Sequence, residues 1–270
     1  MRLIIVTASV GLLSARQEDC LASWYNKAND TPTLIHVQSG MQEDGELQDD
    51  PPDFPTYIIR SKQILGVVPA YTLGINKAME LGADLIACFH DDLEILQQDW
   101  DKEVQTLFRL NQDAILAGFG GATGLGTEDI YQTPYNPMHL ARQNFYSNLI
   151  DAESHGMRST EFIQCACFDG FSQIGRAKFI HDAYTYLLSL GITHHAYDSA
   201  IGALAYRDGG EAWLVPIRCQ HYGGMTAVGS SQYQEWAKQQ NAKGDQGFWE
   251  ESHRIVYEEL REILPIRIGG

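Results

Sequence analysis

The chain has 270 residues, of which 44% are hydrophobic, enough to bury the core of one large domain or two small ones. It carries 19 basic and 35 acidic residues, which give a formal net charge of −16 at pH 7. The hydrophobic content excludes large-scale disorder, and the acidic excess disfavours nucleic acid as a partner, because binding to a phosphate backbone depends on Lys and Arg releasing counterions.

The first half of the chain alternates strand-like and helix-like patterns. In chain order we expect a strand at 3–6, a helix at 17–28, a strand at 33–37, a helix at 71–81, a strand at 85–89, a helix from 100 and a strand at 114–118. Segment 38–55, rich in Pro, Gly and acidic residues, is predicted to be a long irregular loop. The glycines at 118–126 do not have GxGxxG spacing and no Walker lysine follows them, so they predict a flexible loop near a site.

The second half is predicted to contain a strand at 162–168, helices at 177–190 and 199–206, and a strand at 212–219 that Pro216 interrupts. Beyond Gly229 the chain becomes polar and helical, with a narrow apolar stripe at 255–263. The stripe indicates a helical extension packed on the preceding domain, with a partner-binding helix as the alternative. We therefore expect an α/β domain at 1–228 and a C-terminal helical extension at 229–270.

The N-terminal residues and the cysteines predict where in the cell the protein is found. The apolar run at 1–7 is too short for a signal peptide, and no run elsewhere approaches the length of a membrane span. The five cysteines are an odd number, and Cys165 and Cys167 would point to opposite faces of one strand, which predicts reduced, mostly buried thiols. We expect a soluble, cytoplasmic protein with no membrane span.

An apolar run at 83–89 ends in the sequence His90-Asp91-Asp92-Leu93-Glu94. Carboxylates at the end of a buried strand provide the oxygen ligands that Mg²⁺ and Mn²⁺ bind, and Mg²⁺ usually combines one or two carboxylates with the phosphates of a substrate. The segment therefore predicts a metal-bound nucleotide. The alternative is a solvated turn between the strand and the next helix.

Several segments resemble, in order and spacing, those of the GT-A glycosyltransferases of the family 2 type, and the resemblance covers roughly residues 1–225. The matching segments are the glycine- and asparagine-bearing helix at 66–78, the strand with its DxD element at 84–94, the acceptor-side turn Phe168-Asp169-Gly170-Phe171, the catalytic-acid position in His195-Ala196-Tyr197-Asp198, and the late strand at 216–224.

This resemblance implies a GT-A fold, Rossmann-like with a mixed, mostly parallel sheet flanked by helices. It implies metal-dependent transfer of a sugar from a nucleotide-sugar donor, with UDP-sugars favoured, to a hydroxyl of a saccharide or another acceptor, with inversion. The implied cofactor is Mn²⁺ or Mg²⁺, with Asp92 and His221 as metal ligands. An imidazole ligand favours Mn²⁺ over Mg²⁺, and an ordinary polar role is the alternative for His221.

The resemblance also implies the catalytic and donor-binding residues. Asp198 is the predicted general base, because a helix N-terminus favours its ionised form, although it could simply cap that helix. Asp169 is the competing base, a group that orients the acceptor, or a turn residue before Gly170. The candidate donor-binding residues are Thr7, Ser39, Asn76, His90 and Asp91. Because His90 replaces the first carboxylate of the motif, and Gln38-Ser39 stands where a base-reading Asp is common, the donor base stays open.

The acceptor side and other function classes also stay open. His194, His195, Trp213 and the tyrosine-rich segment 131–146 could line an acceptor groove or belong to the core. A nucleotide-sugar-forming nucleotidyltransferase is one alternative, but residues 7–13 lack the basic character of its phosphate loop. A catalytically silent sugar- or protein-binding module of the same fold is another. Transfer onto a modified DNA base would require a basic patch that overrides the net charge.

Overall fold

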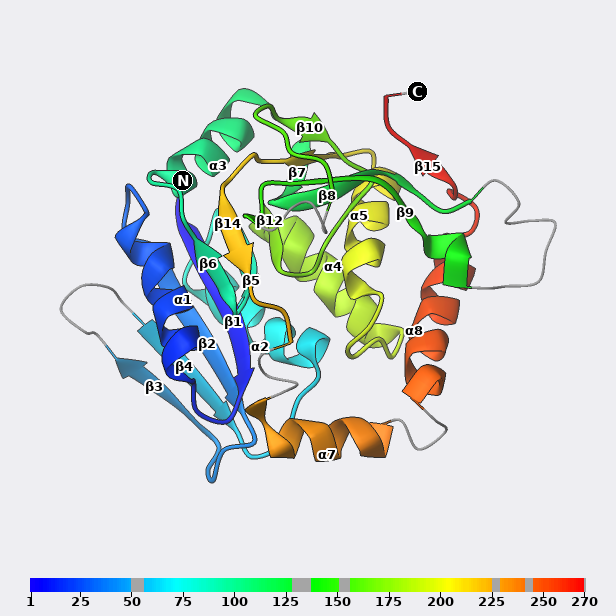
Figure 1. The fold of residues 1–270 in the computed structure, drawn as a ribbon. Coiled ribbons are helices and arrows are strands. Elements are labelled where there is room, and N and C mark those ends of the chain that lie inside the picture. Colours follow the sequence, from blue (N-terminus) through cyan, green and yellow to red (C-terminus); the bar gives the residue numbers. More distant parts are fainter. Residues whose placement is uncertain (50–55, 128–136, 151–155, 225–228, 241–244, 270) are drawn as a thin grey trace.

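A mixed nine-stranded sheet crosses the centre of the molecule in the computed structural model, which describes residues 1–49, 56–127, 137–150, 156–224, 229–240 and 245–269 (Figure 1). The strand order is β10-β13-β7-β12-β5-β1-β2-β4-β3. These strands are β1 (Leu3–Val10), β2 (Thr33–Ser39), β3 (Gly45–Asp49), β4 (Thr56–Ser61), β5 (Leu85–His90), β7 (Ala114–Gly118), β10 (Ile163–Gln164), β12 (Ser172–Arg176) and β13 (Glu211–Leu214).

Helices cover both faces of this sheet, and the alternation of β1 explains why. Ile4 and Val6 belong to a core shared with α2 (Val67–Glu80), α4 (Ala177–Ser189) and α5 (Tyr197–Arg207). Leu3 and Ile5 belong to a second core, shared with α1 (Ala15–Asn26) and α3 (Trp100–Leu110). Because successive side chains of a strand point to opposite faces, an uninterrupted apolar strand must be covered on both sides. The predicted α/β arrangement of a mixed sheet flanked by helices is confirmed.

Four parallel strands end at the same edge of the sheet: β5, β1, β2 and β4. The strand order reverses direction at β1. The chain moves from β1 outward to β2 on one side and returns through α2 to β5 on the other side of β1. The register pairs Ala8 of β1 with His90 of β5 and with Val37 of β2. In open α/β sheets, ligands bind in the crevice beyond the strand ends at such a switch point.

Several predicted elements differ from those in the structure. The loop expected at 38–55 contains β3, which pairs antiparallel with β4, a strand that was not expected. The strand expected at 162–168 is two strands, β10 in the large sheet and β11 (Cys167–Phe168) in a smaller one. The strand expected at 212–219 has the predicted interruption at Pro216, which separates β13 from β14 (Cys219–His221), because proline cannot donate to a sheet ladder.

The glycine-rich segment is also not a loop. Residues 120–125 form β8 (Gly120–Leu125), which pairs with β9 (Arg142–Ser147), β11 and β15 (Ile266–Arg267) in a second sheet. A Cβ atom added at Gly118 would lie 2.6 Å from the ring of Phe168, and one at Gly120 would lie 2.9 Å from the ring of Phe171. These glycines are therefore needed for close packing against aromatic rings rather than for chain mobility.

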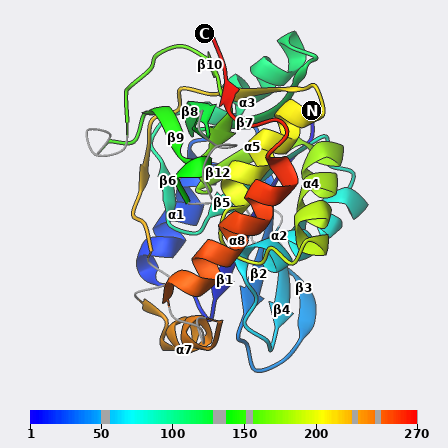
Figure 2. The same ribbon diagram turned by 90° about the vertical axis from the view of Figure 1, so that its right-hand side faces the viewer.

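The C-terminal region packs on the rest of the chain. Helix α8 (Asp245–Leu260) lies beside α5, as Figure 2 shows, and contacts the short helix η1 (Pro137–Leu140). Strand β15 beyond it joins β8. Helix α7 (Ser231–Gln240) precedes α8. The predicted boundary after residue 228 borders 225–228, which lie outside the described residues, so the two-part division stays a prediction. No helix in the described part of the chain has the length and apolar character needed to cross a membrane.

Candidate functional site

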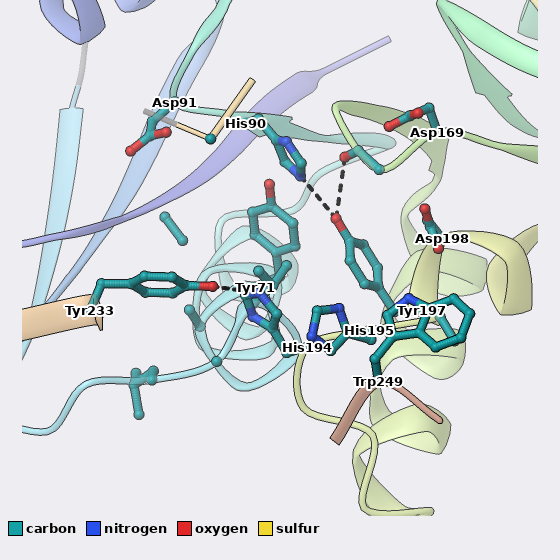
Figure 3. A pocket seen from close by; sticks show the side chains of 18 of the residues that line it. Tyr71, His90, Asp91, Asp169, His194, His195, Tyr197, Asp198, Tyr233 and Trp249 are labelled. Carbon is teal, nitrogen blue, oxygen red and sulfur yellow. Dashed lines mark hydrogen bonds between the residues drawn. The ribbon is translucent and has the colours of Figure 1, made fainter. Parts of the chain in front are cut away.

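A cavity of about 460 Å³ opens beyond the ends of β1, β2 and β5 (Figure 3). This volume lies within the range of roughly 300–1,000 Å³ that is usual for small-molecule sites. Its lining residues come from parts of the chain that are far apart in sequence. They include Ser39, His90, Asp91, Asp92, Arg142, Asp169, His194, His195, Tyr197, Asp198, Tyr233, Trp249 and His253.

Three possible metal ligands meet at the edge of this cavity: His90, Asp92 and His221. His90 ends β5, Asp92 follows it, and His221 ends β14, which pairs antiparallel with β6 (Leu93–Ile95). This pairing carries His221 to the acidic turn. Its Nε2 lies 3.1 Å from Asp92 Oδ1 and 3.3 Å from His90 Nδ1. The ring of Phe171 stacks on that of His221 with centroids 5.0 Å apart and fixes its plane.

Hydrogen bonds orient His90 toward the other two ligands. Its Nε2 lies 2.9 Å from the hydroxyl of Tyr197, and that hydroxyl lies 3.4 Å from the carbonyl oxygen of Gly170. If Nε2–H donates to the tyrosine and the tyrosine donates to the carbonyl, Nδ1 keeps its lone pair. Burial lowers the pKa of His90, and the nearby His221 lowers it further, so the imidazole is neutral at pH 7. Partners of this kind set the tautomer of metal-binding histidines.

The three side chains fit a divalent cation. All their ligand atoms lie within 4.8 Å of one another. Adjacent ligands on an octahedral cation lie about 3 Å apart, close to the two separations given above. Two imidazoles and one carboxylate suit Mn²⁺ better than Mg²⁺, which prefers oxygen ligands alone. His90 is predicted from the sequence to bind the donor, and the structure puts its ring beside Asp92 and His221.

Arg142 joins the two candidate bases. The guanidinium, at the start of β9, donates from one nitrogen to Asp169 Oδ2 at 3.1 Å and from another to Asp198 Oδ2. Asp198 lies in the first turn of α5, where its Oδ1 also accepts a hydrogen bond from the backbone N–H of Ser199 at 2.8 Å. Burial raises the pKa of Asp169, but Arg142, the imidazoles of His90 and His221 and the backbone N–H of Phe171 together outweigh burial, so the net effect is a pKa below its usual range.

The turn that carries Asp169 depends on a glycine. Asp169 and Gly170 follow β11, and a Cβ atom at Gly170 would lie 2.2 Å from the Tyr197 hydroxyl. Any other residue here would displace the ring that orients His90. The same turn therefore positions both a candidate base and the support of a candidate metal ligand.

Replacing Arg142 by Gln should destabilise the fold and make its stability less sensitive to acid. The loss at pH 7 should be roughly 1–3 kcal/mol, between the values for exposed and buried ion pairs. The depressed pKa of Asp169 stabilises the wild type above the usual carboxyl pKa of 3.8, and this contribution disappears as the pH falls through the lower folded value. The difference between wild type and Arg142→Gln in urea unfolding should therefore shrink as the pH falls below 3.8; a constant difference would contradict this explanation.

Other predicted residues fall into two groups. Ser39 and Asp91 line the cavity, as do His194 and His195, and Asp91 accepts a hydrogen bond from the Gln17 side chain at 2.7 Å. Among the described residues, those that do not line it include Thr7, Asn76 and Trp213. Thr7 is buried and donates to the carbonyl of Phe89, Asn76 lies on the exposed side of α2, and Trp213 donates to Glu211. Part of segment 131–146, residues 131–136, lies outside the described residues.

Several residues of the site were not found from the sequence. Arg142 is a single basic residue with no motif around it, and its role depends on contacts with residues 27 and 56 positions away. Tyr197 stands next to Asp198 in the sequence, but no pattern there indicates that its hydroxyl contacts His90. Trp249 and His253 are spaced by four positions, which would place them on one face of a helix, and this spacing was the one available signal.

No protein-family model matches the chain, and no curated protein matches its sequence. The solved structures similar to it include the following three. The mannosyltransferase PcManGT from Pyrobaculum calidifontis, in complex with GDP-Man and Mn²⁺, is 15% identical, with a TM-score of 0.49 over 96% of this chain and 70% of that one. TarS 1–349 from S. aureus is 10% identical, with a TM-score of 0.47 over 96% and 70%. A197 from STIV is 10% identical, with a TM-score of 0.45 over 82% and 86%. Similarity this low leaves the function to be argued from the site.

Proposed function

We propose that the protein is a metal-dependent glycosyltransferase that moves a sugar from a nucleotide-sugar donor to an acceptor hydroxyl. One observation carries this proposal. A group of three possible cation ligands and a pair of carboxylates bridged by Arg142 lie at the same cavity, at the switch point of the sheet. Asp92, His221 and His90 are the proposed cation ligands. Mn²⁺ is the preferred cation because two of the three are imidazoles.

The charge of the cavity supports the need for a cation. Among its described lining residues, four are carboxylates, Asp91, Asp92, Asp169 and Asp198, and Arg142 is the one Lys or Arg. A diphosphate would be repelled by this excess of negative charge. A bound divalent cation would reverse that repulsion and stabilise the charge that develops on the leaving diphosphate.

The arrangement of the cavity suggests how a donor would lie in it. The leaving nucleotide and the attacking hydroxyl must approach the transferred carbon from opposite sides in a single displacement. We place the nucleoside toward Ser39, at the end of β2, and the acceptor toward Asp198. Asp91 and Ser39 remain proposed donor contacts, whereas Thr7 and Asn76 do not line the cavity. UDP-sugars stay the favoured donors on the resemblance of the sequence.

Asp198 is the proposed general base. A single displacement needs one carboxylate to take the proton of the acceptor hydroxyl and no enzyme nucleophile. Hydrogen bonds from Arg142 and from the N–H of Ser199 hold the carboxylate in place. The proton passes from the acceptor oxygen to Asp198 while the bond to the leaving diphosphate breaks. The product therefore has the inverted anomeric configuration.

A panel of nucleotide sugars, each with and without Mn²⁺, tests the proposal. Metal-dependent release of UDP or GDP supports a glycosyltransferase. Exchange of pyrophosphate would favour a nucleotidyltransferase, and thermal stabilisation by a sugar without any turnover would favour a binding module. NMR of the product from an α-linked donor should show a β linkage, and retention of the α configuration would refute the single displacement.

His221→Ala should weaken Mn²⁺ activation more than Mg²⁺ activation. An imidazole is a good ligand for Mn²⁺ and a poor one for Mg²⁺, so loss of one of the two imidazole ligands weakens the preference for Mn²⁺. The half-activating Mn²⁺ concentration should rise at least as much as the roughly 10- to 100-fold effect of losing an outer-shell partner. Activity measured over a series of both metals checks this, and an unchanged metal preference would remove His221 from the ligand set.

A further inference from the structure

Helix α8 contributes two side chains to the cavity, Trp249 and His253, which lie one turn apart. Their ring centroids are 3.8 Å apart with an angle of 33° between the planes. The Nδ1 of His253 lies 2.9 Å from the carbonyl oxygen of Trp249. When Nδ1–H donates to this carbonyl, Nε2 of the neutral ring is a hydrogen-bond acceptor. Both side chains are half-buried, so the cavity wall here is a supported aromatic surface with a polar edge.

This surface belongs to the Asp198 side of the cavity. In Figure 3, Trp249 and His195 are drawn on the same side as Asp198, and Tyr233 enters from the other side. Burial lowers the pKa of His195 and of His253. The negative charge of Asp198 raises the pKa of both, by less than burial lowers it. Both imidazoles are therefore uncharged at pH 7 and within electrostatic reach of the proposed base.

The chemistry of this wall matches a sugar ring better than an anion. An uncharged pyranose offers an apolar C–H face to an aromatic ring, and hydroxyl groups to neutral imidazoles that can both donate and accept. An acceptor carrying phosphate or carboxylate groups would need a free cation. Arg142, the one Lys or Arg among the described lining residues, is already paired with both Asp169 and Asp198.

We propose that Trp249, His195 and His253 form a binding subsite for a sugar ring of the acceptor, and that the acceptor is an uncharged saccharide. This inference rests on the proposed function, because it is the proposed reaction that requires an acceptor next to Asp198. It adds a role for the C-terminal helix, which supplies part of the substrate site as well as packing on α5.

Two substitutions of Trp249 test the subsite, with methyl hexosides of glucose, galactose, mannose and N-acetylglucosamine as acceptor probes. Trp249→Ala should raise the acceptor KM by about tenfold or more, because the aromatic face is lost. Trp249→Phe keeps a flat ring and should retain most of the affinity. Nucleotide affinity and acceptor-independent donor hydrolysis should stay within about twofold of wild type in both variants. Trp236→Ala, in α7 and outside the cavity lining, is the matched control for removal of a C-terminal tryptophan.

An unchanged acceptor KM in Trp249→Ala would overturn the subsite. A matched loss of nucleotide affinity would also overturn it, because the ring would then serve the donor. If wild type releases no nucleotide from any donor, the proposed function fails, and saturation-transfer NMR with the same methyl hexosides decides the subsite separately. Sugar signals present with wild type and Trp236→Ala but lost with Trp249→Ala would support it, and signals unaffected by Trp249→Ala, or absent with wild type, would overturn it.

Discussion

Asp92→Asn should abolish Mn²⁺-dependent binding of the nucleotide, and with it turnover, while the fold stays intact. Asp92 is buried at the end of β5 and is the one carboxylate that faces both imidazoles of the candidate metal group. An amide carries no charge and is a weaker ligand, so the cation would lose its anionic partner. We expect nucleotide affinity in the presence of Mn²⁺ to fall by about 100-fold or more, since even outer-shell changes cost roughly 10- to 100-fold. Calorimetric titration of UDP and GDP with and without Mn²⁺ measures this effect.

Asp91→Asn is the matched control for this substitution. It removes the same charge one residue away, from a carboxylate that accepts a hydrogen bond from Gln17 and does not belong to the candidate metal group. Its nucleotide binding should still depend on Mn²⁺. Undiminished turnover in Asp92→Asn, with an unfolding temperature equal to that of wild type, would show that Asp92 is not a ligand of the catalytic cation. Loss of cation dependence only in Asp91→Asn would transfer the role to that residue.

Asp198→Asn should lower the turnover number by about 10²-fold or more while leaving nucleotide affinity nearly unchanged. The carboxylate is proposed to act on the acceptor proton in the transition state, so its loss should not affect binding of the donor. Asparagine can still accept the hydrogen bond from the N–H of Ser199, which keeps the first turn of α5 in place. Steady-state kinetics, with nucleotide affinity measured separately, distinguishes the two quantities.

Asp169→Asn is the necessary comparison, because Arg142 contacts both carboxylates and both can reach the cavity. The Asp169 side chain is 37% exposed and that of Asp198 is 20% exposed, so accessibility alone does not favour Asp198. We expect the smaller loss in Asp169→Asn, from displacement of Arg142 rather than from loss of a base. The reverse order of the two effects, at equal stability, would make Asp169 the base.

The sequence by itself determined the α/β class and the acidic end of β5. Uninterrupted apolar runs such as 85–89 require cover on both faces of a sheet, and helical spacing at 71–81 and 177–190 indicated what covers them. The change from Phe89 to His90-Asp91-Asp92 is local, so a pattern of neighbouring residues was enough to select Asp92. The resemblance to GT-A glycosyltransferases in the order of several segments also selected His221 and Asp198 as site residues. The structure brings Asp198 to the cavity and His221 to its edge.

Only the tertiary structure decided which distant side chains meet. His221 reaches His90 across 131 positions because β14 pairs with β6, and Arg142 reaches Asp198 across 56 because β9 lies beside β8. Strand pairings of this kind depend on long-range packing, which leaves no period in the sequence. The glycines of β8 are a second example. A glycine-rich composition is typical of a mobile loop, and only the folded structure places the rings of Phe168 and Phe171 against these glycines. Local patterns specify what each segment can form, and the free energy of packing the segments together decides which functional groups become neighbours.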